Sequence, residues 1–318
     1  DIETLIYGAT ALAQERIEAG LAGEYLSLSR NVALVCLFKK MQKLESHHYF
    51  AYLEAERDGA IVSRFLSMNV SPLIIKYTTP EDVAKVLKSL EDSFSIFRFL
   101  NSGDGFEFQR NILSNISKPV IFKETDDEPI LLLSIIKATM ERNNLKPEET
   151  SIGFVGINKA IVRATEVLNS FYAMKILGYD HNDNMMMTFE NSGGLATNMQ
   201  NVVSSCDICI WIEKDLALGA ADIATPGSIL IFWLEDSVDS SYFKDKGVRQ
   251  IINVNLTDLC VLLTISIKIL LKSGELFFST DSLDKISSML AEYLNENYSL
   301  PSFFSEGYER LLKKLQIA

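Results

Sequence analysis

The sequence predicts a two-domain α/β protein, and three observations lead to this fold class. The chain has 318 residues, which is long for a single hydrophobic core. Short apolar segments alternate with helical patterns along most of its length, as in folds built on parallel sheets. Residues 151–180 read as a strand, a tight turn, a helix and a second strand that ends in an acid. We expect an N-terminal domain over residues 1–128 and a C-terminal domain over residues 129–318.

The N-terminal domain is expected to join helices to a small parallel sheet. Apolar residues recur at helical spacing over residues 1–58, so this region is predicted to be mostly helical. A helix is expected to begin at Thr79 and Pro80, because Thr caps helices, Pro suits the first turn, and two acids follow. The other expected elements are strands at residues 59–66, 71–79, 95–101 and 118–124, and a helix at residues 104–116.

The C-terminal domain is expected to be a Rossmann-like, doubly wound sheet. An apolar helix over residues 129–144 opens it, and Asp126 and Asp127 are predicted to cap that helix. The apolar run at residues 259–271 and the segment 281–296 are predicted to form closing helices. Strands with helices between them are expected at residues 151–156, 173–180, 207–213, 228–235 and 250–255.

Charge and hydropathy exclude several classes of partner. The net charge is −12 and the isoelectric point about 4.9, so neither nucleic acid nor an anionic membrane surface is expected to bind. The longest apolar run, residues 259–271, contains Lys268 and is too short to span a bilayer. The N-terminus lacks a basic region, so no signal peptide is expected and the protein is predicted to be cytoplasmic.

Cys206 and Cys209 form a Cys-x-x-Cys pair. The pair falls in a segment predicted to be a strand, where residues three apart point to opposite faces. A redox or zinc role would need a helix N-terminus or a second pair, so both are interpreted as core cysteines. The scattered cysteines are typical of a reducing compartment.

The segment that ends at Asp180 carries the candidate cofactor site. Gly156 follows an apolar strand and can make a tight turn, whereas Asn158 stands where a second glycine would admit a pyrophosphate, and its side chain is expected to intrude. Ile161 stands in place of a third glycine. Asp180 has the spacing of an acid that binds an adenosine ribose. A unit that never binds a nucleotide fits these residues equally well. The predicted cofactor-binding residues, for NAD or NADP in a weakened site, are Gly156, Ile157, Asn158 and Asp180.

Three other features have simpler structural interpretations. Gly193 and Gly194 could face a phosphate, but a plain turn is favoured. The acids at residues 126–128 could hold a metal, but helix capping explains them. His47 and His48 are adjacent, so on a helix they would point about 100° apart, and a surface or interface role is favoured over joint metal binding.

Several segments, taken in order, resemble malic enzymes. The segment from Lys118 to Ala164 resembles the central region of that family, where a strand, an acidic loop and an apolar helix lead into the cofactor-binding domain. The order of similar segments is preserved over nearly the whole chain. The other segments that resemble the family are YLSLSRNVALVCLF, GAIVSRFLSMNVSPLIIKYTTPEDV, SILIFWLEDSVDS and SLPSFFSEGYERLL.

The resemblance implies malate oxidation with a nicotinamide cofactor and decarboxylation beside a divalent metal. A tyrosine acid, a lysine base and three metal-binding carboxylates would carry this chemistry. The tyrosine position falls at Arg30 and the lysine position near Asp58. The asparagine of a family Asn-Pro motif falls at Asp236. The carboxylate positions fall near Leu100, Asn101 and Lys123 or Glu124, with Asp104 or Glu107 as alternative acids.

The residues at these positions differ from the family's catalytic and metal-binding residues, and this leaves three hypotheses about function. In the first, the chain is a malic-enzyme-like protein that has lost its catalytic groups and needs no metal. It would act in binding or assembly, as a homo-dimer or in a hetero-oligomer with a protein partner. In the second, it is an NAD(P)-dependent oxidoreductase acting on malate or a related 2-hydroxy acid, with Lys123, Glu124, Asp126 and Asp236 as relocated groups. In the third, it is a nucleotide-binding sensor.

Overall fold

The chain folds into two compact units. Unit 1 comprises the described residues up to Lys123 together with Ser266–Phe277, and unit 2 comprises Glu124–Ile265 and the described residues from Phe278 onward. The computed structural model describes residues 30–39, 46–101, 105–218, 220–234, 237–243, 245–256, 258–297, 299–303 and 305–315.

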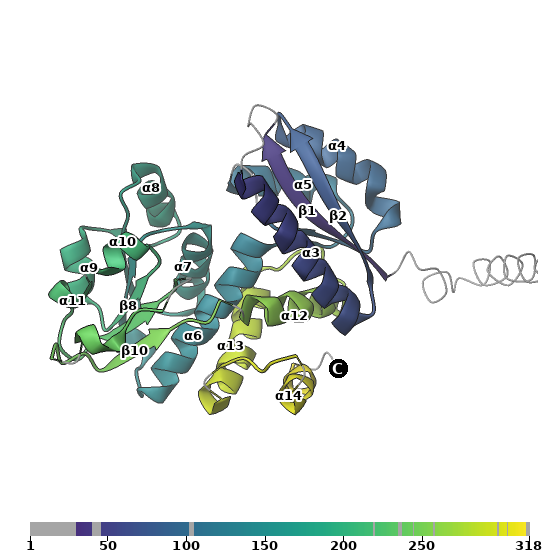
Figure 1. Ribbon diagram of the computed structural model, residues 1–318. Helices are drawn as coiled ribbons and strands as arrows, with labels where there is room; N and C mark the ends of the chain where they lie inside the picture. Colours follow the sequence, from purple (N-terminus) through teal and green to yellow (C-terminus); the bar gives the residue numbers. More distant parts are fainter. Residues whose placement is uncertain are drawn as a thin grey trace, which may run out of the picture. The chain divides into compact units, whose positions relative to one another are not determined.

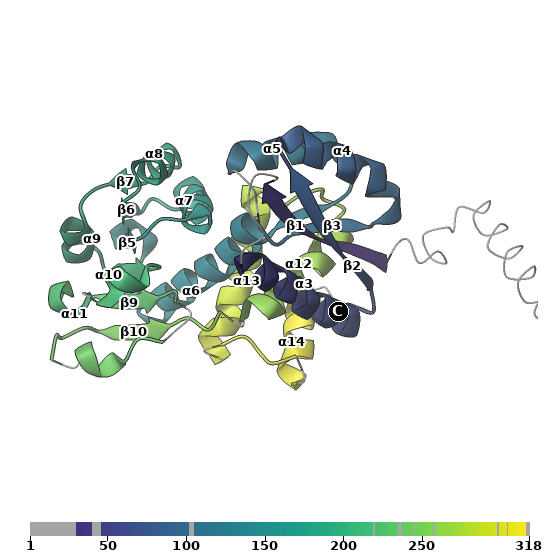
Figure 2. The same ribbon diagram turned by 45° about the horizontal axis from the view of Figure 1, so that its top comes forward.

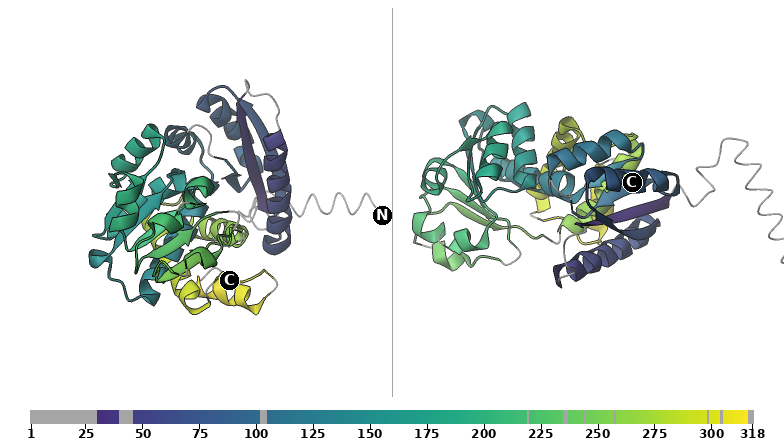
Figure 3. Two further views of the ribbon diagram at one scale, coloured as in Figure 1. Left: turned by 60° about the vertical axis from the view of Figure 1, so that its left-hand side comes forward. Right: turned by 90° about the horizontal axis from the view of Figure 1, so that it is seen from above.

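Unit 1 contains a four-stranded parallel sheet with the strand order β2-β1-β3-β4. Helix α3 lies along one face of this sheet, and α4 and α5 cover the other (Figure 1, Figure 3). The strands are β1 (Asn31–Lys39), β2 (Asn69–Tyr77), β3 (Ile96–Phe99) and β4 (Val120–Phe122), and the helices are α3 (Ser46–Leu66), α4 (Pro80–Leu90) and α5 (Phe106–Asn115).

Alternate side chains of β1 enter different cores because successive residues of a strand point to opposite faces. Val35 and Leu37 belong to a buried cluster with Leu87 of α4 and Phe108 of α5. Cys36 belongs to a cluster on the α3 side. The central strand of unit 1 is therefore buried on both faces, which is typical of parallel sheets.

The predicted helical character of residues 1–58 is wrong at Asn31–Lys39, which forms β1. The predicted strand at residues 59–66 is also wrong, because this segment lies within α3. Both segments are short, nearly continuous apolar runs, and periodicity does not separate a buried strand from a buried helix in such runs. The part of this prediction that covers residues 1–29 lies outside the described residues.

Helix α4 begins where the sequence predicts, with Thr79 as its N-cap residue and Asp82 as the other member of a capping box. The carboxylate Oδ2 of Asp82 accepts hydrogen bonds from the backbone nitrogens of Thr78 and Thr79, at 3.0 and 3.1 Å. Asp127, predicted to cap α6, has helical backbone angles and makes no capping hydrogen bond. It lies in a π-helical turn (Lys123–Asp127) that runs directly into α6. The capping interpretation of these acids is therefore wrong for Asp127.

Unit 2 contains a six-stranded parallel sheet with the order β10-β9-β8-β5-β6-β7. Helices α9 and α10 lie on one side of it and α6 and α7 on the other (Figure 2). Chain order reverses between β5 and β8, so the predicted Rossmann-like, doubly wound arrangement is confirmed. The strands are β5 (Ser151–Val155), β6 (Lys175–Tyr179), β7 (Leu195–Ala196), β8 (Ile208–Trp211), β9 (Ile229–Phe232) and β10 (Gln250–Asn253).

Three of the helices in unit 2 form one packed group. Helices α6, α7 and α13 pack against one another, and Lys137 of α6 is buried at that junction. The predicted helix at residues 259–271 is confirmed as α12 (Asp258–Ser273), and among the described residues no helix is long and apolar enough to cross a bilayer. The remaining helices are α6 (Glu128–Arg142), α7 (Lys159–Phe171), α8 (Asp183–Asn191), α9 (Met199–Ser205), α10 (Lys214–Leu218), α11 (Ala220–Ile223), α13 (Thr280–Asn297) and α14 (Glu306–Lys314).

Cys206 and Cys209 are buried in one core cluster. Their interpretation as core cysteines is confirmed, but the expectation that they face opposite sides of a strand is wrong. Cys206 ends helix α9, and only Cys209 lies in β8. A hydrogen bond with Cys206 and burial hold the pKa of the Cys209 thiol well above its usual value, so this thiol is protonated and unreactive.

Candidate functional site

Gly156 makes the turn at the carboxyl end of β5, where the strand order of the sheet reverses. Its φ of +84° lies in the left-handed region, and its N–H donates to the Tyr179 carbonyl at 2.8 Å. A Cβ at this position would lie 2.7 Å from Cγ1 of Ile212 and 2.9 Å from Cγ of Glu213. Both the backbone angle and the space require glycine here. Ligands of doubly wound sheets bind at such reversal points.

Asp180 ties the turn to the neighbouring strand. Its Oδ2 accepts from the Ile157 N–H at 2.6 Å, and its Oδ1 accepts from the Asn182 N–H at 2.7 Å. Charge-assisted hydrogen bonds of this kind are the strong ones. The acid that the sequence predicts to bind a ribose therefore already has a structural role, because each of its oxygens holds one backbone amide.

Asn158 caps helix α7. Its Oδ1 accepts from the Ile161 N–H at 3.0 Å, so the side chain turns toward the helix. The side chain therefore occupies the start of α7 and uses one of its free backbone amides. The first turn of α7 keeps the partial positive charge of a helix N-terminus, which suits an anion. The side chains of Ile157 and Ile161 are both buried.

Acidic side chains gather at the mouth of this turn. Burial and the charge of Asp180 raise the pKa of Glu213. His181 opposes this rise, and Asp215 adds to it. His181 is itself held by Tyr179, whose hydroxyl lies 3.0 Å from Nδ1. Glu213 thus lies beside Gly156 and within electrostatic reach of Asp180 and Asp215. Like charges repel, so these carboxylates disfavour a phosphate group placed directly beside them.

Glu213, Tyr179 and His181 were not among the sequence-predicted site residues. Glu213 could have been found by its position, because it follows the strand that is adjacent to β5 across the reversal of strand order. That adjacency is a property of the strand order, which the local pattern does not contain. Tyr179 and His181 flank the predicted Asp180 and carried no motif of their own.

Gly193 and Gly194 end helix α8. Their N–H groups donate to the carbonyls of Glu190 and Phe189 at 3.0 and 3.1 Å. A Cβ at Gly194 would lie 2.3 Å from the Phe189 ring. The plain-turn interpretation is confirmed, because both amides are used within the turn.

Replacing Gly156 with alanine is expected to destabilise the chain by about 2–4 kcal/mol, since a left-handed angle and a side-chain clash act together. Gly227→Ala is a matched control: Gly227 also has φ +84°, and a Cβ added there would have nothing within 4 Å of it. That control should cost about 1–2 kcal/mol. Urea unfolding followed by circular dichroism measures both. Equal losses would show that Ile212 and Glu213 do not press on this turn.

Comparison with known proteins identifies the fold. The malic enzyme of Pyrococcus horikoshii superposes with a TM-score of 0.77 over 98% of this chain and 82% of its own, at 13% identity. The NAD-dependent malic enzyme of Thermotoga maritima gives 0.73 over 99% and 93%, also at 13% identity. The chain is malic-enzyme-like in fold. No family model matches it.

A similarity in sequence alone is weaker. The NAD-dependent malic enzyme 1 of Bacillus subtilis is 20% identical over 193 residues, which cover 59% of this chain. The chain spans 44% of the length of that relative. The malic-enzyme resemblance read from the segments is therefore matched by both comparisons, and the fold is the part that they establish.

Asp58, near which the resemblance places the lysine base, belongs to a buried ion pair. Asp58 of α3 accepts from Nη1 of Arg98 at 3.0 Å through Oδ2, and the two side chains are 3% and 1% exposed. Its Oδ1 accepts from Nε and Nη2 of Arg57 at 2.9 and 2.7 Å. Both oxygens of Asp58 are therefore engaged by guanidinium groups. Arg30, where the resemblance places the tyrosine, is exposed.

Leu100 and Asn101, near which the resemblance places two metal-binding carboxylates, have structural contacts. Leu100 is buried beside Cys36 and Ala55. Asn101 uses its whole side-chain amide on one residue: Oδ1 accepts from the Leu37 N–H, and Nδ2 donates to the Leu37 carbonyl, both at 2.9 Å. Leu100 offers no oxygen to a metal, and the Asn101 oxygen already accepts from the Leu37 backbone.

The other acidic and basic residues to which the resemblance points have different surroundings. Lys123 pairs with Glu54, and Glu124 accepts from Nζ of Lys159 at 2.9 Å. Among the described residues, no group of three or more His, Cys, Asp or Glu could hold a metal. Glu107 is exposed in the first turn of α5, and Asp126 is buried in the π-helical turn. Asp104 and Asp236, and the side chains of His47 and His48, lie outside the described residues.

Proposed function

We propose that this chain is a non-catalytic, malic-enzyme-like binding or assembly protein. One observation carries the proposal: Asp58, near which the resemblance places the lysine base, forms a buried pair with Arg98 and also contacts the half-exposed Arg57. General base catalysis needs a group that can exchange a proton near neutral pH. Both oxygens of Asp58 accept hydrogen bonds from arginines, so this carboxylate is unsuited to that task. A lysine in its place would put three cations together.

The metal half of malate chemistry is also poorly supported by the described residues. Magnesium and manganese prefer oxygen ligands with negative charge. Leu100 offers no oxygen, and Asn101 is already bonded to the Leu37 backbone. Without a metal, the polarisation of a substrate carbonyl would have to come from other groups.

The purified chain is expected to give no malate-dependent reduction of NAD or NADP in the presence of magnesium or manganese. The Bacillus subtilis malic enzyme serves as the positive control in the same assay. Turnover that requires both malate and metal, and that a chelator abolishes, would refute the non-catalytic proposal.

A second candidate function is that of an NAD(P)-dependent oxidoreductase acting on malate or a related 2-hydroxy acid. Gly156 favours it, because its left-handed turn and the N-terminus of α7 are features that hold dinucleotides. Gly156, Ile157, Asn158 and Asp180 would bind the cofactor. The similar proteins named NAD-dependent malic enzymes point to NAD rather than NADP.

Ligand-induced stabilisation separates these functions from a nucleotide sensor. A ligand at about 100 times its dissociation constant adds roughly 2.7 kcal/mol of stability. Thermal unfolding with NAD, NADP, their reduced forms and adenine nucleotides tests all three. Stabilisation without turnover would support a sensor, and stabilisation with turnover on a panel of 2-hydroxy acids would support the oxidoreductase.

Assembly is part of the proposal. A homo-dimer or a hetero-oligomer with a protein partner is proposed because a non-catalytic relative of an enzyme acts through what it binds. Sedimentation of the full chain, alone and over a range of concentrations, measures self-association. A monomer at all concentrations would leave the hetero-oligomer, which cross-linking in the source cells would then identify. A cytoplasmic location stays a prediction of the sequence.

A further inference from the structure

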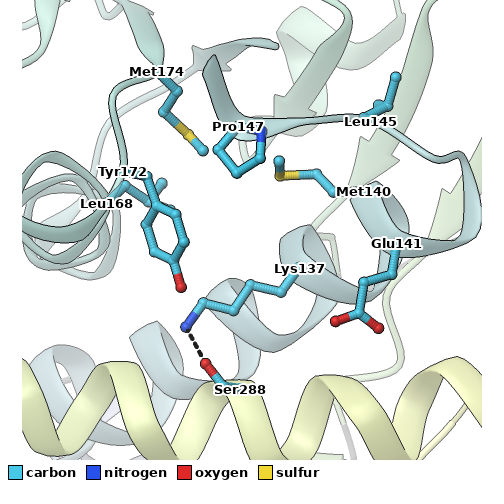
Figure 4. A pocket seen from close by; sticks show the side chains of 9 residues that line it. All are labelled: Lys137, Met140, Glu141, Leu145, Pro147, Leu168, Tyr172, Met174 and Ser288. Atoms are coloured by element: carbon cyan, nitrogen blue, oxygen red, sulfur yellow. Dashed lines mark hydrogen bonds between the residues drawn. The ribbon is translucent and has the colours of Figure 1, made fainter. Parts of the chain in front are cut away.

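A hollow of about 170 Å³ lies within unit 2, away from the glycine turn. It opens between α6, the end of α7 and α13 (Figure 4). Lys137 and Tyr172 form its polar side, and Met140, Leu168 and Met174 are among its apolar walls. A cavity of this size accommodates a molecule about as large as benzene or slightly larger.

The ammonium group of Lys137 has no hydrogen left for a ligand. Its Nζ lies 2.7 Å from Oδ1 of Asp284, 2.9 Å from the Asp284 carbonyl, and 2.8 and 2.9 Å from Oγ of Ser287 and Ser288. An ammonium carries three hydrogens, and four acceptors surround this one. An acidic ligand would therefore find no donor here and would have to displace Asp284.

The charges around the hollow are negative in sum. Lys137 is balanced by Asp284, whose Oδ1 also accepts from the Tyr172 hydroxyl at 3.0 Å. Burial lowers the pKa of Lys137 and Asp284 opposes that shift. If Lys137 lost its proton, the surroundings would become more negative still. Glu141, on the opposite side of the hollow, adds a further carboxylate (Figure 4).

Glu141 is placed to receive a cation at the mouth. Its Oε2 accepts from Nδ2 of Asn295 at 3.1 Å, and its Oε1 makes no hydrogen bond within the part of the chain that the structure describes. Glu141 is exposed, so a ligand can reach its carboxylate. The soft side chains of Met140 and Met174 also line the hollow and can adapt to an apolar body.

We propose that this hollow binds a small primary amine with an apolar body, with the ammonium group on Glu141 and the body against Met140, Leu168 and Met174. Complementary charge selects the amine over an acid of the same shape. The site is independent of the proposed function, because none of these residues belongs to the glycine turn or to the malic-enzyme positions.

Three ligands with the same ring test the proposal on the full chain by ligand-observed NMR and calorimetry at neutral pH. Benzylamine is expected to bind with a dissociation constant on the order of 1 mM, as its few heavy atoms allow. Benzyl alcohol should bind about tenfold more weakly, and benzoate more weakly still. Equal binding of benzoate and benzylamine, or no binding of benzylamine at about 20 mM, well above that constant, would overturn the proposal.

Variants locate the site. Glu141→Gln removes the charge while keeping an acceptor for Asn295, and should weaken benzylamine about tenfold. Glu148→Gln makes the same charge change on an exposed side chain beyond the hollow and should leave the affinity within about twofold. Met174→Trp should abolish binding by filling the space. Equal losses in the two glutamate variants, or unchanged affinity in Met174→Trp with its fold intact by circular dichroism, would refute this location.

Discussion

Replacing Asp58 with alanine is expected to lower the free energy of unfolding by about 3–5 kcal/mol, because it leaves Arg98 as a buried charge without its carboxylate. Asp58 and Arg98 are 3% and 1% exposed, and their atoms are 3.0 Å apart. Equilibrium unfolding in urea measures the loss. If the loss is below about 1 kcal/mol, water reaches Arg98 and the pair is not buried as the structure has it.

Two further variants separate the ion pair from packing. The double variant Asp58→Leu with Arg98→Met replaces the pair by apolar residues and is expected to recover most of the loss. Arg57→Ala removes a contact to the same carboxylate from a side chain that is 54% exposed, and should cost less than about 1 kcal/mol. A double variant as unstable as the single one would show that shape, and not charge, explains the effect.

Asp258→Asn is expected to stabilise the protein at pH 7.5 and to lose this advantage in acid. Burial raises the pKa of Asp258 from 3.8 to about 6, against the hydrogen bond from the Leu300 N–H. A raised pKa means that the folded state holds its proton more tightly than the unfolded state. The protonated carboxyl group of Asp258 therefore contributes to folding stability below pH 4, and this contribution is lost as pH rises through about 6.

The shift of the Asp258 pKa from 3.8 to about 6 means that the charged side chain lowers folding stability by about 3 kcal/mol above pH 6, since one pKa unit is worth about 1.4 kcal/mol. Asp258 begins α12, so loss of its charge gives back about 0.5–1 kcal/mol of helix-dipole stabilisation. The net gain at pH 7.5 should be about 2 kcal/mol, falling to zero or slightly below near pH 4. Denaturant unfolding at both pH values measures it.

Asp281→Asn provides the control for this pH effect. Asp281 also lies in the first turn of a helix, but its side chain is 58% exposed and pairs with Lys285. This change should alter stability by less than about 1 kcal/mol at either pH. A pH-independent gain for Asp258→Asn would contradict the raised pKa and assign the gain to packing.

Local pattern was sufficient for the elements whose signals lie within one short segment. Helix α4 follows from Pro80 and the acids after it, and the sheet of unit 2 follows from strands that alternate with helices. The glycine turn was also visible, because Gly156 must adopt an angle that other residues avoid. The order of similar segments was enough to indicate the malic-enzyme fold.

The same reasoning did not find the groups that meet across the fold. Glu213 reaches Gly156 only because β8 lies beside β5, and Lys137 meets Asp284 across a separation of 147 residues. The pairing of Asp58 with Arg98 likewise joins a helix to a strand that is distant in sequence. In each of these pairs, the two residues are too far apart in the sequence to fall within one short segment.

The sequence by itself determined the α/β class, the alternation of unit 2 and the position of the glycine turn, because backbone preferences and capping act over a few residues. Tertiary structure alone decided that Asn31–Lys39 is a strand and residues 59–66 a helix, since both are apolar runs that either element can bury. It also decided what Asp58, Asp180 and Lys137 do, because the energy of a buried charge depends on which distant groups surround it.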